Sequence, residues 1–371
     1  MTFKTKDENI AAVLYGAHDL RVEKRPIPQP QAGEVLLRIK ATGICGSDLH
    51  YYLDGGLGPR RIDSSKPMIL GHESAGIVVS IGDDTTKLKV GDRVVIEPGR
   101  SCGVCSYCCQ GRYNLCPKMK FSSSLLQGPN DGSLCRYACF PENLCHRLPD
   151  NMSFDDGALI EPLAVALHSV ERTPIKVGST VHVFGAGPVG LLTAAVAFVK
   201  GAVNCTIFDI NQDRLDFAKK YLPNGVRVVL LPKIKFQNAE DTITWAQDNA
   251  IHFLRDLSND DSDNFADVVF ECTGVAECIM LSMYVVQRGG TVMLIGLGRD
   301  KTLMPTDIIT TREVDIRGNF RYANVHKKAI TLVEQGRINL SSLVSHRFKL
   351  ENSNILACLP LPLSNADFLA V

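Results

Sequence analysis

The sequence has little that would attach it to nucleic acid or to a membrane. Its 40 lysines and arginines are balanced by 40 aspartates and glutamates, so the formal net charge is zero. The lack of a basic excess argues against nucleic acid as a partner, and the lack of a block of like charges argues against a charged tail. The N-terminus has no apolar signal core, and no stretch is long and apolar enough to span a bilayer. We therefore expect a soluble, cytoplasmic protein.

Internal repeats and low-complexity tracts are also missing, so the chain reads as an ordinary globular protein. Its 371 residues are enough for two domains, each with a sizeable core. The 13 cysteines would be unusual as disulfides in a reducing compartment. Thiols or metal ligands are the better interpretation.

Two patterns of strands divide the chain. Up to about residue 160, short strands such as Glu34–Lys40 and Gly91–Ile96 are broken by glycine and proline, which predicts an all-β barrel. From Thr180 onwards, strands alternate with helical stretches, which predicts βαβ units and a parallel sheet. These strands are expected at Val181–Phe184, Thr206–Asp209, Val226–Leu230, Asp267–Phe270 and Val292–Ile295, with a long connection at Gln237–Asp263 that includes a solvated loop at Ser258–Asp263. The predicted fold class is α/β, with a β-barrel domain beside a doubly wound parallel sheet.

A glycine-rich motif follows the first of these later strands and opens an apolar helix at Leu191–Val199. In that context, the backbone can approach a pyrophosphate, which then lies at the helix N-terminus. The alternative is an ordinary tight turn. The motif consists of Gly185, Ala186, Gly187, Pro188, Val189 and Gly190.

An acidic residue ends the next strand, 24 residues after Gly185. The carboxylate of Asp209 can accept hydrogen bonds from the adenosine ribose and would repel a 2′-phosphate, which favours NAD over NADP. Arg214 either flanks the adenine or is a surface residue.

Two groups of residues have the chemistry of zinc ligands. Cys45, His72 and Glu73 offer a thiolate, an imidazole and a carboxylate, which can hold zinc while leaving one position open. The spacing C-x2-C-x2-C-x7-C can close a tetrahedral site with a structural role, and free surface thiols are the alternative. Its ligands would be Cys102, Cys105, Cys108 and Cys116, with Cys109 leaving the third ligand ambiguous by one residue.

The order of these motifs resembles that of the zinc-dependent medium-chain dehydrogenases. The motifs are Cys45-Gly46-Ser47-Asp48, Gly71-His72-Glu73, the four cysteines, Glu161-Pro162-Leu163 and the glycine motif. A Phe-Arg-Tyr signature at 320–322 is similar to that of the polyol branch, which contains sorbitol, xylitol and L-arabinitol dehydrogenases. The resemblance covers about residues 11–350.

The resemblance implies an arrangement of domains and subunits. A GroES-like zinc catalytic domain is expected at 1–163, with the structural zinc lobe at 100–117. A Rossmann NAD-binding domain is expected at 164–319 and a return segment at 320–371, with the active site in the cleft between the domains. A homotetramer or homodimer is expected, paired through the Rossmann domain near Thr291–Leu297.

The resemblance also implies roles for single residues. Glu161 would hydrogen-bond the zinc-bound water or ligate zinc directly beside Cys45, His72 and Glu73. Ser47, Glu161 or His50 would take part in catalysis by moving the proton. The substrate would contact Tyr51, Glu161, Arg321 and Tyr322. The cofactor would contact Gly185, Gly187, Pro188, Val189, Gly190, Asp209, Arg214, Cys272, Thr273, Leu297 and Phe320.

Structural alternatives remain for four of these residues. Glu161 precedes a proline and could be a capping carboxylate. His50 could be a surface histidine and Arg321 a surface cation. Cys272 ends a predicted buried strand, where a packing role is expected.

The implied function is oxidation of a secondary alcohol of a polyol to a ketose, with NAD as the hydride acceptor and zinc making the hydroxyl acidic. One alternative is a zinc-dependent dehydrogenase that acts on a simple alcohol or an amino alcohol. Another is a non-catalytic NAD-binding homologue.

The C-terminal stretch departs from the family pattern. Val344–Leu350 is similar to the family's return strand, but Ile355–Leu363 contains two prolines where the family has a regular helix. We expect this departure to affect stability more than the site, because the site motifs lie upstream.

Overall fold

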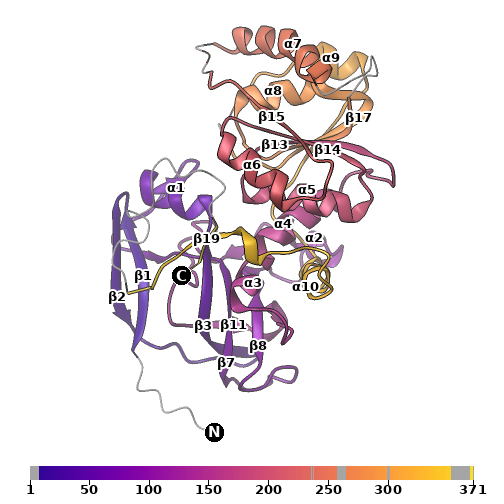
Figure 1. Ribbon diagram of the computed structural model, residues 1–371. Coiled ribbons are helices and arrows are strands. Elements are labelled where there is room, and N and C mark those ends of the chain that lie inside the picture. Colours follow the sequence, from indigo (N-terminus) through magenta and orange to yellow (C-terminus); the bar gives the residue numbers. More distant parts are fainter. Residues whose placement is uncertain are drawn as a thin grey trace. The chain divides into compact units, whose positions relative to one another are not determined.

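The computed structural model describes residues 8–234, 236, 238–256, 265–298, 301–351 and 368–370 (Figure 1). Contacts divide the chain into two compact units. The first contains Met1–Ala164 and the chain from Ala323 onwards, and the second contains Val165–Tyr322. The predicted loop at Ser258–Asp263 and the proline-containing stretch at Ile355–Leu363 lie outside the described residues.

The first unit is built around antiparallel strands. Strand β3 (Glu34–Ile44) pairs with β7 (Glu73–Ile81) and β11 (Tyr137–Pro141), and β7 continues the sheet through β8 (Arg93–Ile96) to β12 (Cys145–Arg147). Alternate residues of β3 and its neighbours point into a common apolar core, as expected for strands with one covered face. The β-barrel domain predicted from the short strands, which the resemblance implied to be GroES-like, is therefore confirmed.

Smaller elements complete this unit. The strands are β1 (Asn9–Gly16), β2 (Asp19–Arg25), β4 (Gly56–Leu57), β5 (Arg60–Arg61), β6 (Met68–Ile69), β9 (Gly99–Arg100) and β10 (Lys120–Phe121). The helices are α1 (Gly46–Asp54), α2 (Ser106–Cys109), α3 (Phe154–Ala158) and α10 (His326–Glu334), with 3-10 turns η1 (Tyr113–Leu115), η2 (Glu142–Leu144) and η3 (Ser341–Leu343).

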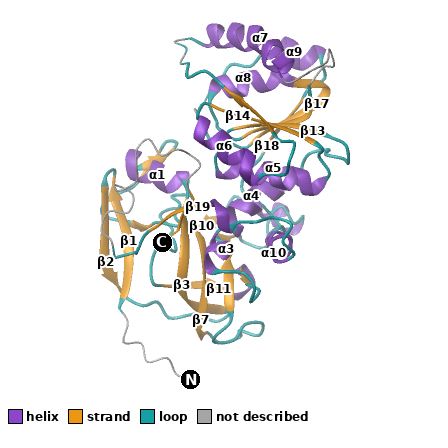
Figure 2. Ribbon diagram, viewed as in Figure 1, coloured by secondary structure: helices purple, strands orange, loops and turns teal. Residues whose placement is uncertain are grey.

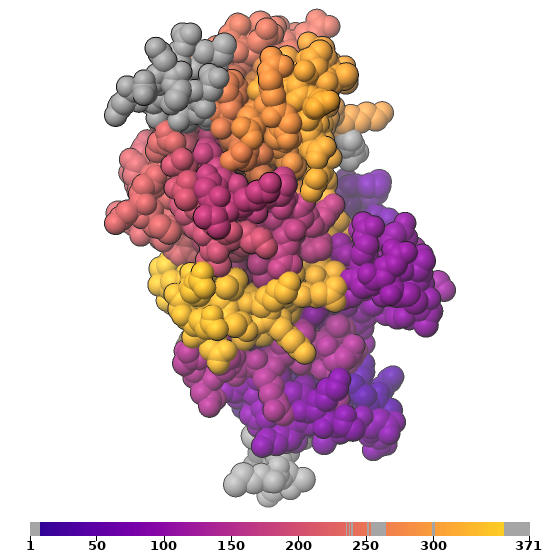
Figure 3. All heavy atoms as spheres, turned by 90° about the vertical axis from the view of Figure 1, so that its right-hand side faces the viewer, coloured from indigo at the N-terminus to yellow at the C-terminus, as the bar shows by residue number. Residues whose placement is uncertain are grey.

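The C-terminal segment returns to the first unit and adds strands to its sheet. The return strand predicted at Val344–Leu350 is present as β19 (Val344–Arg347), and β20 (Phe368–Ala370) lies between β19 and β3. Arg347 Nε donates to Asp155 Oδ2 over 2.9 Å, which ties the segment to the barrel. Figure 3 shows this segment in yellow, beside purple and magenta residues of the first unit.

The second unit is a parallel sheet between two layers of helices (Figure 2). In the described residues, its strands follow the order β15 (Arg227–Leu230), β14 (Asn204–Asp209), β13 (Thr180–Phe184), β16 (Ala266–Glu271), β17 (Val286–Leu294) and β18 (Asp315–Gly318). One face is covered by α5 (Pro188–Lys200) and α6 (Gln212–Tyr221), and the other by α7 (Ala239–Asp256), α8 (Ala276–Val285) and α9 (Thr306–Thr311). Helix α4 (Ile160–Glu171) leads from the first unit into the second.

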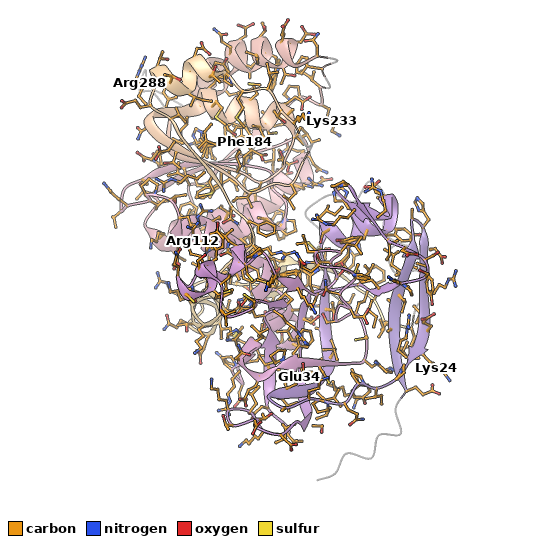
Figure 4. All side chains as sticks on the ribbon, turned by 180° about the vertical axis from the view of Figure 1, so that it is seen from behind. Lys24, Glu34, Arg112, Phe184, Lys233 and Arg288 are labelled. Atoms are coloured by element: carbon orange, nitrogen blue, oxygen red, sulfur yellow. The ribbon has the colours of Figure 1, made fainter. Side chains whose placement is uncertain are left out.

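Both faces of this sheet are covered, so its central strands are almost continuously apolar. Phe184 stacks on Phe208 at 4.5 Å between ring centroids, and both side chains are fully buried. Figure 4 shows Phe184 inside the unit, whereas Lys233 and Arg288 lie at its surface. The predicted doubly wound sheet is confirmed.

The segment Thr291–Leu297, near which copies of the chain were expected to pair, does not form the edge of the sheet. Strand β17 is paired on both sides, and β18 covers its outer edge. The sequence did not reveal β18 because its residues, Asp315–Gly318, lack an apolar run. In the part of the chain that the structure describes, no helix combines the length and apolar character needed to cross a membrane.

Candidate functional site

The register of two strands brings the three candidate zinc ligands of the first unit together. Cys45 follows β3 and precedes α1, while His72 and Glu73 lie where β7 begins. Because Gly43 pairs with Glu73 across the two strands, residues distant in sequence share one end of the sheet. The ligand atoms of Cys45, His72 and Glu73 lie within 4.8 Å of one another. We call this group the catalytic trio.

Asp48 holds the segments that carry the trio. Its Oδ2 accepts from the backbone N of Cys45 at 3.1 Å, and its Oδ1 accepts from the backbone N of Gly71 at 3.1 Å. The same Oδ1 also accepts from Ser123 Oγ at 2.9 Å and lies 3.8 Å from His72 Nδ1. One buried carboxylate therefore links both segments that supply the ligands.

The carboxylate of the trio is confined and has an electrostatic need for a cation. A Cβ at Gly43 would lie 2.2 Å from Glu73 Oε2, so only glycine leaves space for this carboxylate. Oε2 is buried and has no hydrogen-bond partner among the described residues. Burial, followed by the charges of Glu161 and Asp48, raises the pKa of Glu73 well above its usual value. Because a divalent cation would reverse this penalty, the donor set fits zinc with an open position.

The remaining predicted residues of this region lie at different depths. Glu161 is 4% exposed at the start of α4 and contributes to the raised pKa of Cys45, after burial, Glu73 and Asp48, but its carboxylate lies outside the trio. The Ser47 side chain acts to lower the pKa of the nearby Cys45 thiol, against the larger effect of burial. His50 is on the exposed side of α1, with Nδ1 3.2 Å from Asp54 Oδ2.

Tyr51, the next residue of α1, is buried, and its hydroxyl accepts from the backbone N of Leu125 at 3.2 Å.

The four cysteines of the zinc lobe also converge. The sulfurs of Cys102, Cys105, Cys108 and Cys116 lie within 4.8 Å of one another. Two of the separations are 4.0 Å, between Cys102 and Cys108, and 3.5 Å, between Cys105 and Cys108. These values bracket the separation of about 3.8 Å that tetrahedral zinc–sulfur bonds of about 2.3 Å require.

The structure resolves the ambiguity between the adjacent cysteines. The exposed Cys109 directs its sulfur to the backbone O of Val104, 3.7 Å away, and takes no part in the group. Backbone N–H groups of Val104 and Cys105 lower the pKa of Cys102 to about 6, which favours the thiolate that zinc binds. The lobe therefore fits a closed metal site.

In the second unit, the glycine motif forms the turn between β13 and α5. Gly185 has a φ of +97°, a conformation that favours glycine, and Gly187 caps the helix, with Pro188 as its first residue. A Cβ at Gly190 would lie 1.8 Å from the backbone O of Gly185, so the helix packs directly onto the turn. Val189 lies in the first turn of α5. This geometry leaves helix N–H groups available to a pyrophosphate.

Asp209 lies beside this turn at the end of β14. Its Oδ2 accepts from the backbone N of Ala186 at 2.7 Å, and its Oδ1 accepts from the backbone N of Asn211 at 2.9 Å. Arg214 Nη1 lies 3.5 Å from Asp209 Oδ2, and its side chain is mostly buried. Arg214 therefore contacts the acidic residue, which is not the behaviour of a free surface cation.

A second loop of this unit rests on a buried carboxylate that the sequence analysis did not single out. Glu271 is fully buried at the end of β16 and accepts from the backbone N of Thr273 at 2.8 Å and of Gly274 at 2.9 Å, and from the Thr273 hydroxyl. Cys272 lies between Glu271 and this loop, and burial raises the pKa of its thiol. The signal available in the sequence was an acidic residue that directly follows an apolar strand.

This loop also meets the loop after β17, where Leu297 is 67% exposed. A Cβ at Gly298 would lie 1.6 Å from the backbone O of Gly274, so two backbones touch where neither residue has a side chain. Gly43, Gly274 and Gly298 were all missed from sequence, because an isolated glycine does not reveal what it must approach.

Residues 320–322 are the last of the predicted site residues in the second unit. Phe320 is 40% exposed, and the Arg321 guanidinium lies 4.8 Å from its ring centroid. Arg321 has a φ of +51°, an uncommon conformation for a residue with a side chain. Tyr322 is 3% exposed.

Comparisons with known proteins cover both units. Residues 31–150 match the family described as "Alcohol dehydrogenase GroES-like domain", and residues 188–335 match "Zinc-binding dehydrogenase". Sorbitol dehydrogenase from Gallus gallus is 40% identical over 346 residues, which is 93% of this chain and 91% of the relative. D-xylulose reductase A from Aspergillus niger is 39% identical over 354 residues, which is 95% of this chain and 93% of the relative.

Solved structures of similar fold are also dehydrogenases. L-idonate 5-dehydrogenase from Escherichia coli has a TM-score of 0.83 at 26% identity, covering 98% of both chains. The 2R,3R-butanediol dehydrogenase from Bacillus subtilis has a TM-score of 0.79 at 28% identity, covering 98% of this chain and 99% of the other. The likeness extends over nearly the whole chain, and the protein belongs to the zinc-dependent medium-chain dehydrogenases, in the branch that contains the sorbitol dehydrogenases.

Proposed function

We propose that the protein oxidises a secondary alcohol of a polyol to a ketose and passes the hydride to NAD. The observation that carries this proposal is the trio of Cys45, His72 and Glu73, in which a carboxylate oxygen has no hydrogen-bond partner within the described part of the chain. The substrate class rests on relatives named sorbitol dehydrogenase and D-xylulose reductase, which are 38–40% identical over more than 90% of this chain. The protein is an oxidoreductase, and its substrate is a small molecule.

Cys45, His72 and Glu73 would hold the catalytic zinc, and Cys102, Cys105, Cys108 and Cys116 the structural zinc. When bound, catalytic zinc lowers the pKa of a coordinated hydroxyl, and NAD accepts the hydride. The trio would bind the metal and orient the substrate. Asp48 holds together the two segments that carry the trio, through the backbone N of Cys45 and of Gly71. Glu161 is placed to hydrogen-bond the group that fills the open position, because it lies near the trio without belonging to it.

We propose that the proton leaves through this chain's own residues. Ser47, beside Cys45, is the first relay that we propose: its hydroxyl oxygen takes the substrate's proton as it releases its own proton toward His50 or solvent. His50, exposed on the same helix and paired with Asp54, is placed to exchange a proton with solvent. We further propose that Tyr51, Glu161, Arg321 and Tyr322 bind the substrate, whose hydroxyls need several hydrogen-bonding groups.

The residues that would bind the cofactor come from the glycine motif and the next strand. Asp209 would contact the adenosine ribose, and the pyrophosphate would contact Gly185, Gly187, Pro188, Val189 and Gly190. A buried carboxylate at the end of the second strand would repel a 2′-phosphate, which supports NAD over NADP. Cys272, Thr273, Leu297 and Phe320 would line the remainder of the cofactor site, and Arg214 would flank the adenine.

We propose a homodimer or homotetramer that uses the open edge of β18, in place of the segment Thr291–Leu297. An edge strand presents unpaired backbone groups to a second copy. Ile316, on this strand, is 36% exposed.

The test is NADH formation by the purified full chain with sorbitol, xylitol or L-arabinitol, before and after metal chelation. We expect chelator-sensitive turnover of at least one polyol. Cys45→Ser should abolish it, while Cys109→Ser, a matched change at an exposed thiol, should retain it. Turnover of simple alcohols or amino alcohols alone would contradict the polyol assignment, and no turnover by folded, zinc-loaded protein would contradict catalysis.

A further inference from the structure

A third group of metal-ligating side chains lies in the first unit, apart from both zinc sites discussed above. Glu97, His146 and His326 place one ligand atom each within 4.8 Å of one another. Glu97 is 4% exposed and His326 1% exposed, so the cluster lies in the interior and is not a chance grouping of surface side chains. No step of the proposed reaction uses it. We call it the His–Glu–His cluster.

Three separate elements deliver the cluster. Glu97 follows β8, and His146 lies on β12, which pairs with β8. His326 is the first residue of α10, far away in sequence. Rigid elements that converge on one point supply the preorganisation that a metal site needs, since the ligands lose little freedom on binding.

The donor atoms face one another. Glu97 Oε2 lies 2.8 Å from His146 Nε2 and 3.5 Å from His326 Nδ1. Ligands on a tetrahedral zinc, at about 2.05 Å from the metal, lie about 3.4 Å apart, so small side-chain shifts would admit an ion. The imidazole rings of His146 and His326 are nearly parallel, with centroids 5.2 Å apart, and a shared carboxylate lies between their nitrogens.

Outer hydrogen bonds support the carboxylate of the cluster. The Tyr113 hydroxyl donates to the other oxygen of Glu97 at 2.6 Å and accepts from the backbone N of Asn324 at 2.7 Å. Such outer hydrogen bonds orient a ligating carboxylate.

We propose that Glu97, His146 and His326 bind a divalent metal ion of the zinc type. Two imidazoles and one carboxylate suit zinc better than calcium or magnesium, which prefer oxygen ligands. The ion would join the barrel strands to the first turn of α10, close to the segment after Cys108 that carries Tyr113. Its role would be to stabilise the first unit, and it would be independent of the proposed oxidation.

Metal content of the full chain tests this inference. The protein is stripped by a chelator, loaded with Zn²⁺, freed of excess ion and analysed for zinc per subunit. We expect three equivalents, one for each group of ligands. His146→Gln and His326→Gln should each lose one equivalent, and His346→Gln, a matched change at an exposed histidine outside the cluster, should lose none.

Two further measurements keep the outcomes distinct. Cys45→Ser and Cys102→Ser should each remove a different equivalent, so failure of the catalytic or structural site is separable from failure of this one. Zinc-edge anomalous scattering from crystals of the unmodified protein needs no variant and should give a peak between Glu97, His146 and His326. Absence of that peak in zinc-loaded protein, or retention of the third equivalent in both glutamine variants, would overturn the proposal.

Discussion

Gly43 illustrates how a residue without a side chain can decide whether a metal site forms. Its position on β3 faces Glu73, and an added Cβ would lie 2.2 Å from Glu73 Oε2. We predict that Gly43→Ala displaces the carboxylate, removes one zinc equivalent and lowers kcat/KM about a hundredfold or more, since misplacement by about 1 Å can cost that much. Zinc analysis and steady-state kinetics measure both effects.

The matched control lies three residues further on. Gly46 is exposed at the start of α1, and no atom lies within 4 Å of the Cβ that it lacks. Gly46→Ala should leave zinc content and turnover unchanged. Equal activity of the two variants would show that Glu73 does not need the space beside Gly43.

His182 makes a second residue-scale prediction, this time about pH. It is fully buried on β13, its two ring nitrogens have no hydrogen-bond partner among the described residues, and burial lowers its pKa to about 3. The unfolded chain protonates this histidine below about pH 6.5, whereas the folded chain does not. Stability is therefore lost as pH falls from about 6.5 towards 3, amounting to about 2 kcal/mol between pH 7 and pH 5.

His182→Leu removes the titrating group and keeps an apolar side chain beside Phe208, whose ring lies 5.4 Å away. Between pH 7 and pH 5, the free energy of unfolding of the variant should fall by about 2 kcal/mol less than that of the parent. Denaturant unfolding can be followed by Trp245, the sole tryptophan of the chain, which packs in the same unit. An unchanged pH dependence in the variant would contradict the assignment.

At the scale of elements, the zinc lobe contrasts two adjacent cysteines of α2. Cys108 faces the other three ligands, whereas Cys109 faces Val104. Cys108→Ser should therefore remove one zinc equivalent and lower the free energy of unfolding by more than about 4 kcal/mol, because loss of a metal is one of the few mechanisms with effects that large. Zinc content and thermal unfolding provide the measurement.

Cys109→Ser is the control, because it makes the same change one position away. Its zinc content and melting temperature should match those of the parent. A variant at Cys109 that loses metal while one at Cys108 retains it would reverse the assignment of the third ligand.

The elements also show where sequence reasoning succeeds and where it ends. The strand–glycine–helix pattern predicted β13, the turn at Gly185 and α5, because propensity, turn chemistry and periodicity agree locally. The edge strand β18 was missed because Asp315–Gly318 carries no apolar pattern and is a strand only through its pairing with β17. The His–Glu–His cluster was missed for the same physical reason, since three distant elements assemble it.

At the scale of the whole molecule, the open edge of β18 predicts how copies assemble. Ile316→Asp places a charge on that edge and should reduce the mass of the assembly in light scattering, because a buried unpaired charge opposes association. Val177→Asp, at a residue of the second unit that is 89% exposed, should leave the mass unchanged. If both variants keep the mass of the parent, β18 is not the interface.

Gly43 and Gly298 each lie close to a neighbouring atom, but the two contacts differ in which substitutions the chain can tolerate during evolution. What stands opposite Gly43 is the carboxylate end of the Glu73 side chain, which can turn aside, so Gly43→Ala should lose metal while the chain still folds. What stands opposite Gly298 is the backbone of Gly274, 1.6 Å from the missing Cβ, and no substitution shortens a backbone. A selection for stable folding should therefore accept substitutions at the first position and return only glycine at the second.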